Sequence, residues 1–311
     1  EDADRASAVR DRFPKVDAAT QAERVRYWRE VLKELKAIPP ADLSAEDRVN
    51  YAIYRAQVEA LEASAAFRDY EKPFNSDSSF WAEVTGAAQR PLRNLAEYQA
   101  YLRLLADLPR YFGDQIVNMR AGLARGFSVP RVTLSGRDLS IAAIAEAREP
   151  EKNPFYAPFT KMPPKFSEAD QAELKAKAVK AIRESVLPAY TDLLKFMRDE
   201  YMKKARNELD AESYPDGKAY YQSKIREFTT LDITPDAIHQ IGLAEVAKIH
   251  DQMIETMKKT DFSGDFPAFL KFLRTDPGFY AKSKEELLMR AAWISKRVDG
   301  NLDGPSLNAY A

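Results

Sequence analysis

The sequence predicts an all-α protein, a large and irregular domain built from many helices. Apolar residues recur at helical spacing along most of the chain, and prolines interrupt that pattern at intervals. Only 11 of the 311 residues are glycine, too few for the many tight turns of a sandwich or barrel. Apolar residues make up 45% and charged residues 31% of the chain, which is typical of a folded globular protein.

Charge and residue content exclude several classes of function. Lys and Arg number 47 and Asp and Glu 48, so the formal net charge of −1 argues against a nucleic-acid-binding surface over the whole molecule. The absence of cysteine excludes disulfides, thiolate metal sites and cysteine nucleophiles. No stretch approaches the roughly 18 consecutive apolar residues that a membrane-spanning helix needs. We therefore expect no nucleic-acid partner and no transmembrane segment.

Residues 1–149 are predicted to form an N-terminal helical subdomain. Residues 20–38 alternate apolar and charged residues at helical spacing, and the Pro39–Pro40 pair ends that helix. A second helix begins near Ser44, whose hydroxyl can accept an early backbone N–H, and Asp47 adds a favourable charge to the first turn.

Two further helices follow in the same subdomain. Asn94 is a candidate cap for the first, Pro109 separates it from the second, and Gly126 is a plausible stop for the second. Residues 130–134 alone have strand-like composition, and this run is too short to found a sheet.

Residues 150–165 are predicted to form an ordered strap between two helical subdomains. The prolines exclude a regular helix, and the aromatic residues favour packing on the body of the protein over a flexible linker. The prolines are Pro150, Pro154, Pro158, Pro163 and Pro164, and the aromatic residues are Phe155, Tyr156 and Phe159.

Residues 166–302 are predicted to form a second helical subdomain that contains a long kinked helix. Apolar residues keep helical spacing from Val179 to Tyr201, and Pro188 inside this run removes a backbone donor, so we expect a kink near Glu184 and Ser185.

A later helix of the same subdomain is expected to begin at Thr234-Pro235-Asp236, with Thr as its cap and Pro in its first turn. Its apolar stripe consists of Ile238, Gly242, Val246, Ile249, Met253 and Met257. Residues 303–311 form a tail whose origin the sequence leaves open.

The first candidate site is the segment from Tyr214 to Tyr221. Tyr214-Pro215-Asp216-Gly217 predicts a turn, and the glycine beside the paired Tyr220 and Tyr221 can line a cleft in which phenol groups face a ligand. Tyrosines also serve in ordinary helix packing, so a purely structural role stays open.

The second candidate is the helix that carries His239 and Glu245. A zincin helix needs two histidines four residues apart, but Leu243 stands four residues after His239, and His250 lies eleven residues away, about 16 Å along the helix. One metal ion cannot bind both histidines, so we expect this segment to bind no zinc. Glu245 is either a substrate-facing acid or a solvated carboxylate.

Several motifs together resemble the bacterial DUF885 family. The resemblance covers most of the chain, to about Leu302, and is densest between Tyr214 and Val246. Its motifs are Leu43 to Tyr51, Gly126 to Arg131, Asn153 to Phe159, Tyr214 to Gly217, Ala219 to Tyr221, Phe228 to Thr230, Thr234-Pro235, Ile238-His239 and Gly242 to Val246.

The resemblance implies the helical part of a zincin-like (neurolysin-like) metallopeptidase architecture, in proteins that bacteria often export and sometimes anchor to lipid. Family members are typically near twice this length, and their His-Glu-x-x-Pro-Gly-His-His motif lies in the half that would follow Leu302. This chain lacks that motif, so no family metal ligand can be assigned to any of its residues. We therefore expect the chain to be a piece of a longer protein.

These observations combine into one expected function and one alternative. The chain is interpreted as the N-terminal helical portion of a DUF885-type zinc-dependent hydrolase, a peptidase, which forms a wall or lid of the substrate cleft. Zinc would belong to the full-length parent, the partners would be the missing C-terminal half and a peptide-like substrate, and the location would be the periplasm or the cell exterior. Alternatively, the chain is a self-contained helical binding or scaffolding protein without catalytic activity.

Overall fold

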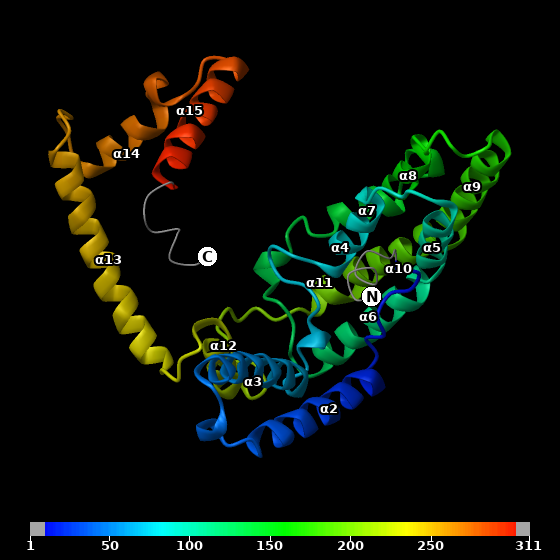
Figure 1. Ribbon diagram of the computed structural model, residues 1–311, viewed down its shortest axis with the longest axis horizontal. Coiled ribbons are helices and arrows are strands. Elements are labelled where there is room, and N and C mark those ends of the chain that lie inside the picture. Colours follow the sequence, from blue (N-terminus) through cyan, green and yellow to red (C-terminus); the bar gives the residue numbers. More distant parts are fainter. Residues whose placement is uncertain (1–9, 303–311) are drawn as a thin grey trace. The chain divides into compact units, whose positions relative to one another are not determined.

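The computed structural model describes residues 10–302 and is all-α, as predicted (Figure 1). Within this range the only strand-like feature is a single bridge between Phe74 and Ser79. The chain divides into a first unit that ends at Ile233 and a second unit that begins at Thr234. The predicted boundaries at 149/150 and 165/166 lie inside the first unit and stay predictions, and the tail 303–311 lies outside the described residues.

The first unit contains long helices joined by short 3-10 turns. Its α-helices are α2 (Ala18–Lys36), α3 (Ala45–Ala66), α4 (Phe80–Gly86), α5 (Leu95–Ala106), α6 (Leu108–Ala124), α7 (Leu139–Ala145), α8 (Ala157–Thr160), α9 (Glu168–Ala181), α10 (Leu187–Phe196), α11 (Met202–Lys204) and α12 (Gly217–Thr229). Its 3-10 turns are Pro40–Asp42, Asp69–Glu71, Ala87–Gln89, Arg131–Leu134, Pro150–Lys152 and Pro154–Tyr156.

Local capping chemistry sets the predicted helix starts. The Ser44 hydroxyl accepts the N–H of Asp47 at the start of α3, and the Asn94 side chain accepts the N–H of Glu97 at the start of α5. Each bond satisfies one of the backbone donors that a helix leaves unpaired at its first turn.

The long helix predicted around Pro188 departs from α geometry where the kink was expected. A π-helical turn, Ile182–Val186, separates α9 from α10, and the N–H of Leu187 bonds the carbonyl of Ile182. Proline at 188 cannot donate to the carbonyl of residue 184 and its ring crowds that group, so a wider turn relieves the conflict. A second π-helical turn, Met197–Tyr201, leads into α11.

The core of the first unit is rich in aromatic residues and includes the proline-rich strap. Phe155 and Phe159 of the strap are fully buried, so both rings are part of this core. Two tyrosines of α5 fix it further, because the Tyr98 hydroxyl donates to the Pro158 carbonyl at 2.8 Å and the Tyr101 hydroxyl to the Phe155 carbonyl at 3.0 Å. The other large buried side chains are Trp81, Phe112, Phe127, Tyr190, Tyr201, Leu105, Leu108 and Met119.

The second unit contains three helices and a small aromatic cluster. They are α13 (Pro235–Lys258), α14 (Phe266–Thr275) and α15 (Lys284–Leu302), with a 3-10 turn at Pro277–Phe279. Thr234 caps α13 through the N–H of Ala237, as predicted. Phe269 is the one buried side chain among those described here, and its ring packs 5.2 Å from that of Phe262.

The apolar stripe of α13 is largely exposed in the described part of this unit. Val246, Ile249 and Met253 are all exposed, and α13 contains no buried residue. Helical periodicity identifies an amphipathic face, but it does not identify what covers that face.

Candidate functional site

A cluster of aromatic rings surrounds the side chain of Lys72 in the first unit. The Lys72 Nζ lies 4.9 Å from the ring centre of Phe127, 4.7 Å from that of Tyr214 and 5.5 Å from that of Tyr220. The rings also contact one another, since those of Phe127 and Tyr214 are 4.9 Å apart and those of Phe127 and Tyr220 are 5.5 Å apart. An ammonium group within about 6 Å of a ring face is attracted by the quadrupole of the ring.

Three separate segments of the chain bring these rings together. Lys72 follows the 3-10 turn Asp69–Glu71, Phe127 follows the end of α6, and Tyr220 lies in the first turn of α12. Gly122 allows the close approach, because a Cβ at this position would lie 2.7 Å from the carbonyl oxygens of both Glu71 and Phe127. The same Gly122 accepts the Phe127 N–H at 2.8 Å, which fixes the chain as it leaves α6.

The acids around Lys72 are paired with other cations. Asp69 accepts a hydrogen bond from Lys224 at 2.6 Å, and the buried Glu71 pairs with Arg125. Among the described residues Lys72 forms no ion pair, and its polar contact is the Tyr214 hydroxyl at 3.4 Å. The ammonium group therefore depends on rings and one phenol oxygen rather than on a carboxylate.

Burial shifts the ionisation of the groups in this cluster. Desolvation lowers the pKa of Lys72 to about 8, assisted by the positive charge of Lys224, although the negative charge of Asp69 opposes the shift. Burial also raises the pKa of Tyr220 well above its usual range, and the nearby Asp69 carboxylate adds to that rise. For Lys224, burial lowers the pKa, but the hydrogen bonds to Asp69 and Glu227 outweigh it and the pKa is raised.

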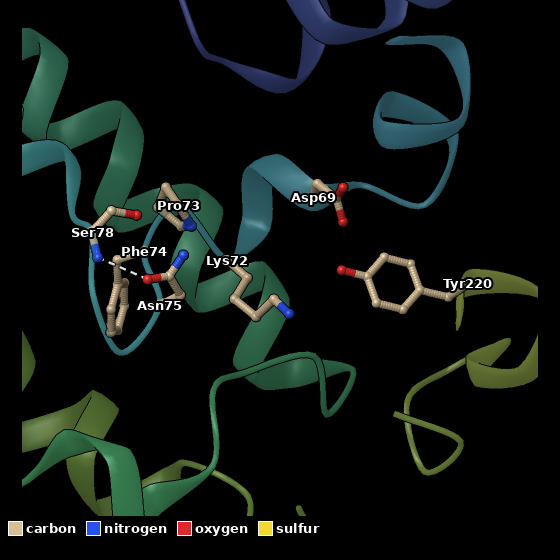
Figure 2. A pocket seen from close by; sticks show the side chains of 7 residues that line it. All are labelled: Asp69, Lys72, Pro73, Phe74, Asn75, Ser78 and Tyr220. Carbon is tan, nitrogen blue, oxygen red and sulfur yellow. Dashed lines mark hydrogen bonds between the residues drawn. The ribbon is translucent and has the colours of Figure 1, made fainter. Parts of the chain in front are cut away.

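An open cavity of about 270 Å³ lies beside Lys72 (Figure 2). In this view the Tyr220 hydroxyl points into the space between Asp69 and Lys72, and Asn75 and Ser78 lie on the other side of Lys72. The lining residues are Asp69, Lys72, Pro73, Phe74, Asn75, Ser78 and Tyr220. This arrangement offers one cation, one acid and several hydrogen-bonding groups to a small polar ligand.

The structure brings part of the first predicted site together at this cavity. Tyr220 lines the cavity, and Tyr214 packs beside it with its hydroxyl donating to the Ser128 carbonyl at 3.1 Å. The predicted turn is present, because the Gly217 N–H donates to the Tyr214 carbonyl at 2.8 Å. Tyr221, by contrast, is exposed.

Asp216 and Gly217 shape the entry to α12. The exposed Asp216 has a φ of 54°, a left-handed conformation at the N-cap position. Gly217 is buried against backbone, because a Cβ there would lie 2.3 Å from the Ala211 oxygen and 2.4 Å from the Glu212 oxygen. Their role in the local structure is to set the path of the chain; the assignment of both to a substrate cleft stays a prediction.

His239 and Glu245, the second candidate site, lie on α13 in the second unit. Both are exposed, and Glu245 forms an ion pair with Lys248 at 3.2 Å. Between residues 10 and 302, no three or more His, Cys, Asp or Glu side chains are grouped so that they could hold a metal ion. The described residues thus do not fit the zinc that the family resemblance implies.

Sequence reasoning missed Lys72 and its neighbours in the cavity. A lysine before a proline in a polar stretch carries no signal of burial, and its aromatic neighbours are 55, 142 and 148 positions away, counting 127 − 72, 214 − 72 and 220 − 72. The dense family resemblance near Tyr220 was the one clue to this region.

The second unit leaves apolar helix faces uncovered in the part of the chain that the structure describes. On α15, Leu287, Ala291, Ile294 and Val298 follow steps of 4, 3 and 4 and so share one face, and all four are exposed. Large exposed apolar faces are typical of surfaces that bind another protein segment.

The all-α fold, the cavity beside Lys72 and the exposed apolar faces of α13 and α15 define the class of this protein. It is a helical protein with a polar cavity in its first unit. A family description, "bacterial protein of unknown function (DUF885)", matches residues 2–306, so the chain belongs to this family. No curated protein matches the chain.

A solved structure shares the fold. It is described as "the putative lipoprotein from Colwellia psychrerythraea", and the two superpose with a TM-score of 0.78 at 19% identity over 91% of this chain and 51% of that one. The chain thus spans about half the length of the structure it matches. Of the helices in residues 10–302, none has both the length and the apolar content required to cross a membrane.

Proposed function

We propose that the chain is the N-terminal helical portion of a longer DUF885 protein, a hydrolase, and that it forms a wall or lid of the substrate cleft. The supporting observation is the uncovered apolar surface of the second unit, on α13 and α15. Burying one Val, Leu, Ile or Met side chain is worth about 1.5–3 kcal/mol, so these faces favour contact with further protein. The match covers only 51% of the similar solved structure, which agrees with the proposal that this chain is part of a longer protein.

The family resemblance supports the finer part of the proposal, a zinc-dependent peptidase acting on a peptide-like substrate. The zinc and its ligands would belong to the C-terminal half, because the described residues of this chain do not fit a metal site. Export of the intact protein, with or without a lipid anchor, is proposed from the resemblance and from the description of the structural neighbour.

The test compares the 311-residue chain with the product of the whole gene. An open reading frame that continues into a His-Glu-x-x-Pro-Gly-His-His segment is expected, and one that stops near residue 311 would refute the proposal. In the longer product, the amides of α13 and α15 should exchange with deuterium more slowly than in the 311-residue chain, because their apolar faces are covered.

A matched pair of variants sharpens the test. Ile294→Asp places a charge on the apolar face of α15 and should destabilise the longer protein by about 2–4 kcal/mol if that face is buried there. Lys296→Asp, two positions along and about 160° around the helix, is the control on the opposite face and should have a small effect. Equal effects of the two variants in the longer protein would contradict the proposed contact.

The alternative, a self-contained helical binding protein, is favoured by the polar cavity beside Lys72. It predicts that the 311-residue chain binds its ligand fully without any further segment.

A further inference from the structure

The cavity in the first unit is lined by a cation without an acidic partner and by the Asp69 carboxylate. Lys72 forms no ion pair among the described residues, while Asp69 is held by Lys224 through one of its oxygens. The other oxygen, Asp69 Oδ1, is buried, and the Tyr220 hydroxyl lies beside this carboxylate (Figure 2). The Lys72 ammonium group is therefore the one that lacks a countercharge, whereas buried charges in proteins are usually paired.

We propose that this cavity binds a carboxylate group that has an N–H on the neighbouring carbon, as in a free amino acid or the last residue of a peptide. The ligand carboxylate would pair with the Lys72 ammonium group, and the ligand N–H would donate to the Asp69 carboxylate, which lines the cavity. The proposal stands on the first unit alone and does not depend on the proposed hydrolase.

The remaining lining residues suit such a ligand. Asn75 Oδ1 accepts the backbone N–H groups of Asp77 and Ser78 at 2.7 and 2.8 Å, so the side chain can offer a ligand its NH₂ group. Ser78 and Tyr220 add hydroxyl groups, and Pro73 and Phe74 provide apolar surface for a short side chain. A volume of about 270 Å³ is at the small end for ligand pockets and matches an amino-acid-sized group.

The charges around the cavity favour a monoanion over phosphate. Lys72 supplies one unpaired positive charge, and the Asp69 carboxylate lines the same space. A dianionic phosphate would meet one cation and one acid, whereas a carboxylate with a neighbouring N–H complements both. Phosphate sites in proteins instead gather several cations or backbone N–H groups.

A purely structural role for Lys72 is the competing explanation. Cation–π contacts with Phe127, Tyr214 and Tyr220 stabilise the ammonium group without any ligand. This explanation predicts that small carboxylates neither bind near Lys72 nor alter its reactivity.

Calorimetric titration of the 311-residue chain with four probes separates these cases. L-Alanine and N-acetyl-L-alanine carry the carboxylate and the N–H, N-acetyl-L-alanine amide lacks the carboxylate, and inorganic phosphate is the dianion. We expect a Kd on the order of 1–10 mM for at least one of the first two probes, as befits so small a ligand, and no comparable binding of the amide or of phosphate. Binding of L-alanine alone indicates a free amino acid, and binding of the N-acetyl compound indicates a peptide terminus.

Two variants and one labelling experiment complete the test. Lys72→Met should weaken binding by roughly tenfold or more, because a charge-assisted hydrogen bond is lost, while Lys180→Met on the exposed face of α9 should leave it unchanged. In the wild-type chain, the carboxylate probe should slow acetylation of Lys72 relative to Lys180, measured by mass spectrometry, which requires no variant to fold.

Three results would overturn the proposal. They are equal binding of the amide and the carboxylate probes, undiminished binding by a folded Lys72→Met chain, and no protection of Lys72 at probe concentrations roughly tenfold above the expected Kd.

Discussion

Substitution of Gly122 by alanine tests the close approach on which the Lys72 cluster depends. A Cβ at this position would lie 2.7 Å from the carbonyl oxygens of Glu71 and Phe127, while ordinary contact begins at 3.4 Å, so each oxygen must move by 3.4 − 2.7 = 0.7 Å. Both atoms belong to the backbone and cannot rotate away. Overpacking of this kind costs about 1–3 kcal/mol, and the better helix propensity of alanine returns up to about 1 kcal/mol.

We therefore expect Gly122→Ala to lower the free energy of unfolding by about 1–2 kcal/mol. For a unit of this size, 1 kcal/mol corresponds to about 2–4 °C, so Tm should fall by about 2–8 °C in a thermal melt followed by far-ultraviolet circular dichroism.

The same helix provides the control for this experiment. Gly113 lies nine residues earlier on α6 (122 − 113), is exposed and has no atom within 4 Å of its would-be Cβ. Gly113→Ala should therefore stabilise the protein by about 0.5–1 kcal/mol through helix propensity alone. The two substitutions should have opposite signs. A Gly122→Ala chain as stable as the Gly113→Ala chain would refute the close-packing argument.

Three further predictions concern stability and metal binding. The pKa of Lys72 falls from 10.5 to about 8 on folding, so the unfolded chain binds more protons than the folded chain between these pH values. The wild type should therefore gain stability relative to Lys72→Met as the pH rises through that window. Urea titrations at pH 7 and pH 10 that give the same difference in unfolding free energy between the two chains would contradict this. Gly217→Ala should lower Tm by several degrees, about 2–8 °C, because its Cβ would meet the backbone of residues 211 and 212; a Tm at or above that of the wild type would argue against it. The 311-residue chain should keep no stoichiometric zinc after dialysis, and His239→Ala should not change its metal content by mass spectrometry; zinc lost only in the variant would show that His239 is a ligand.

Features set by neighbouring residues were predictable from the sequence. The caps Ser44, Asn94 and Thr234 each accept an N–H three positions later, as their side chains allow. The distortion before Pro188 followed from the missing N–H of proline. In each case the physical cause lies within about one helical turn of the effect, which is why one stretch of sequence contained enough information.

Features that depend on distant segments were not predictable. The run 130–134 has strand-like composition, yet residues 131–134 form a 3-10 turn, with Leu134 buried in the core of the first unit. Burial of Lys72 depends on rings contributed by α12 and by the segment after α6. The residues near Lys72 in the sequence do not predict that these segments contact it. Tertiary packing overrides weak local preference in the first case and creates the site in the second.

Each of the two functional proposals rests on a feature that is unfavourable in the chain by itself, a buried charge in one unit and exposed apolar surface in the other. The first unit buries a cation among rings without a carboxylate partner, whereas the second leaves the apolar faces of α13 and α15 in water. Both arrangements cost free energy unless another molecule or segment compensates, and such exceptions are expected at functional sites. A small carboxylate would compensate only the first and further protein only the second. A ligand that protects Lys72 should therefore leave the exchange of α15 amides unchanged, and protection of α15 in a longer protein should not require the ligand.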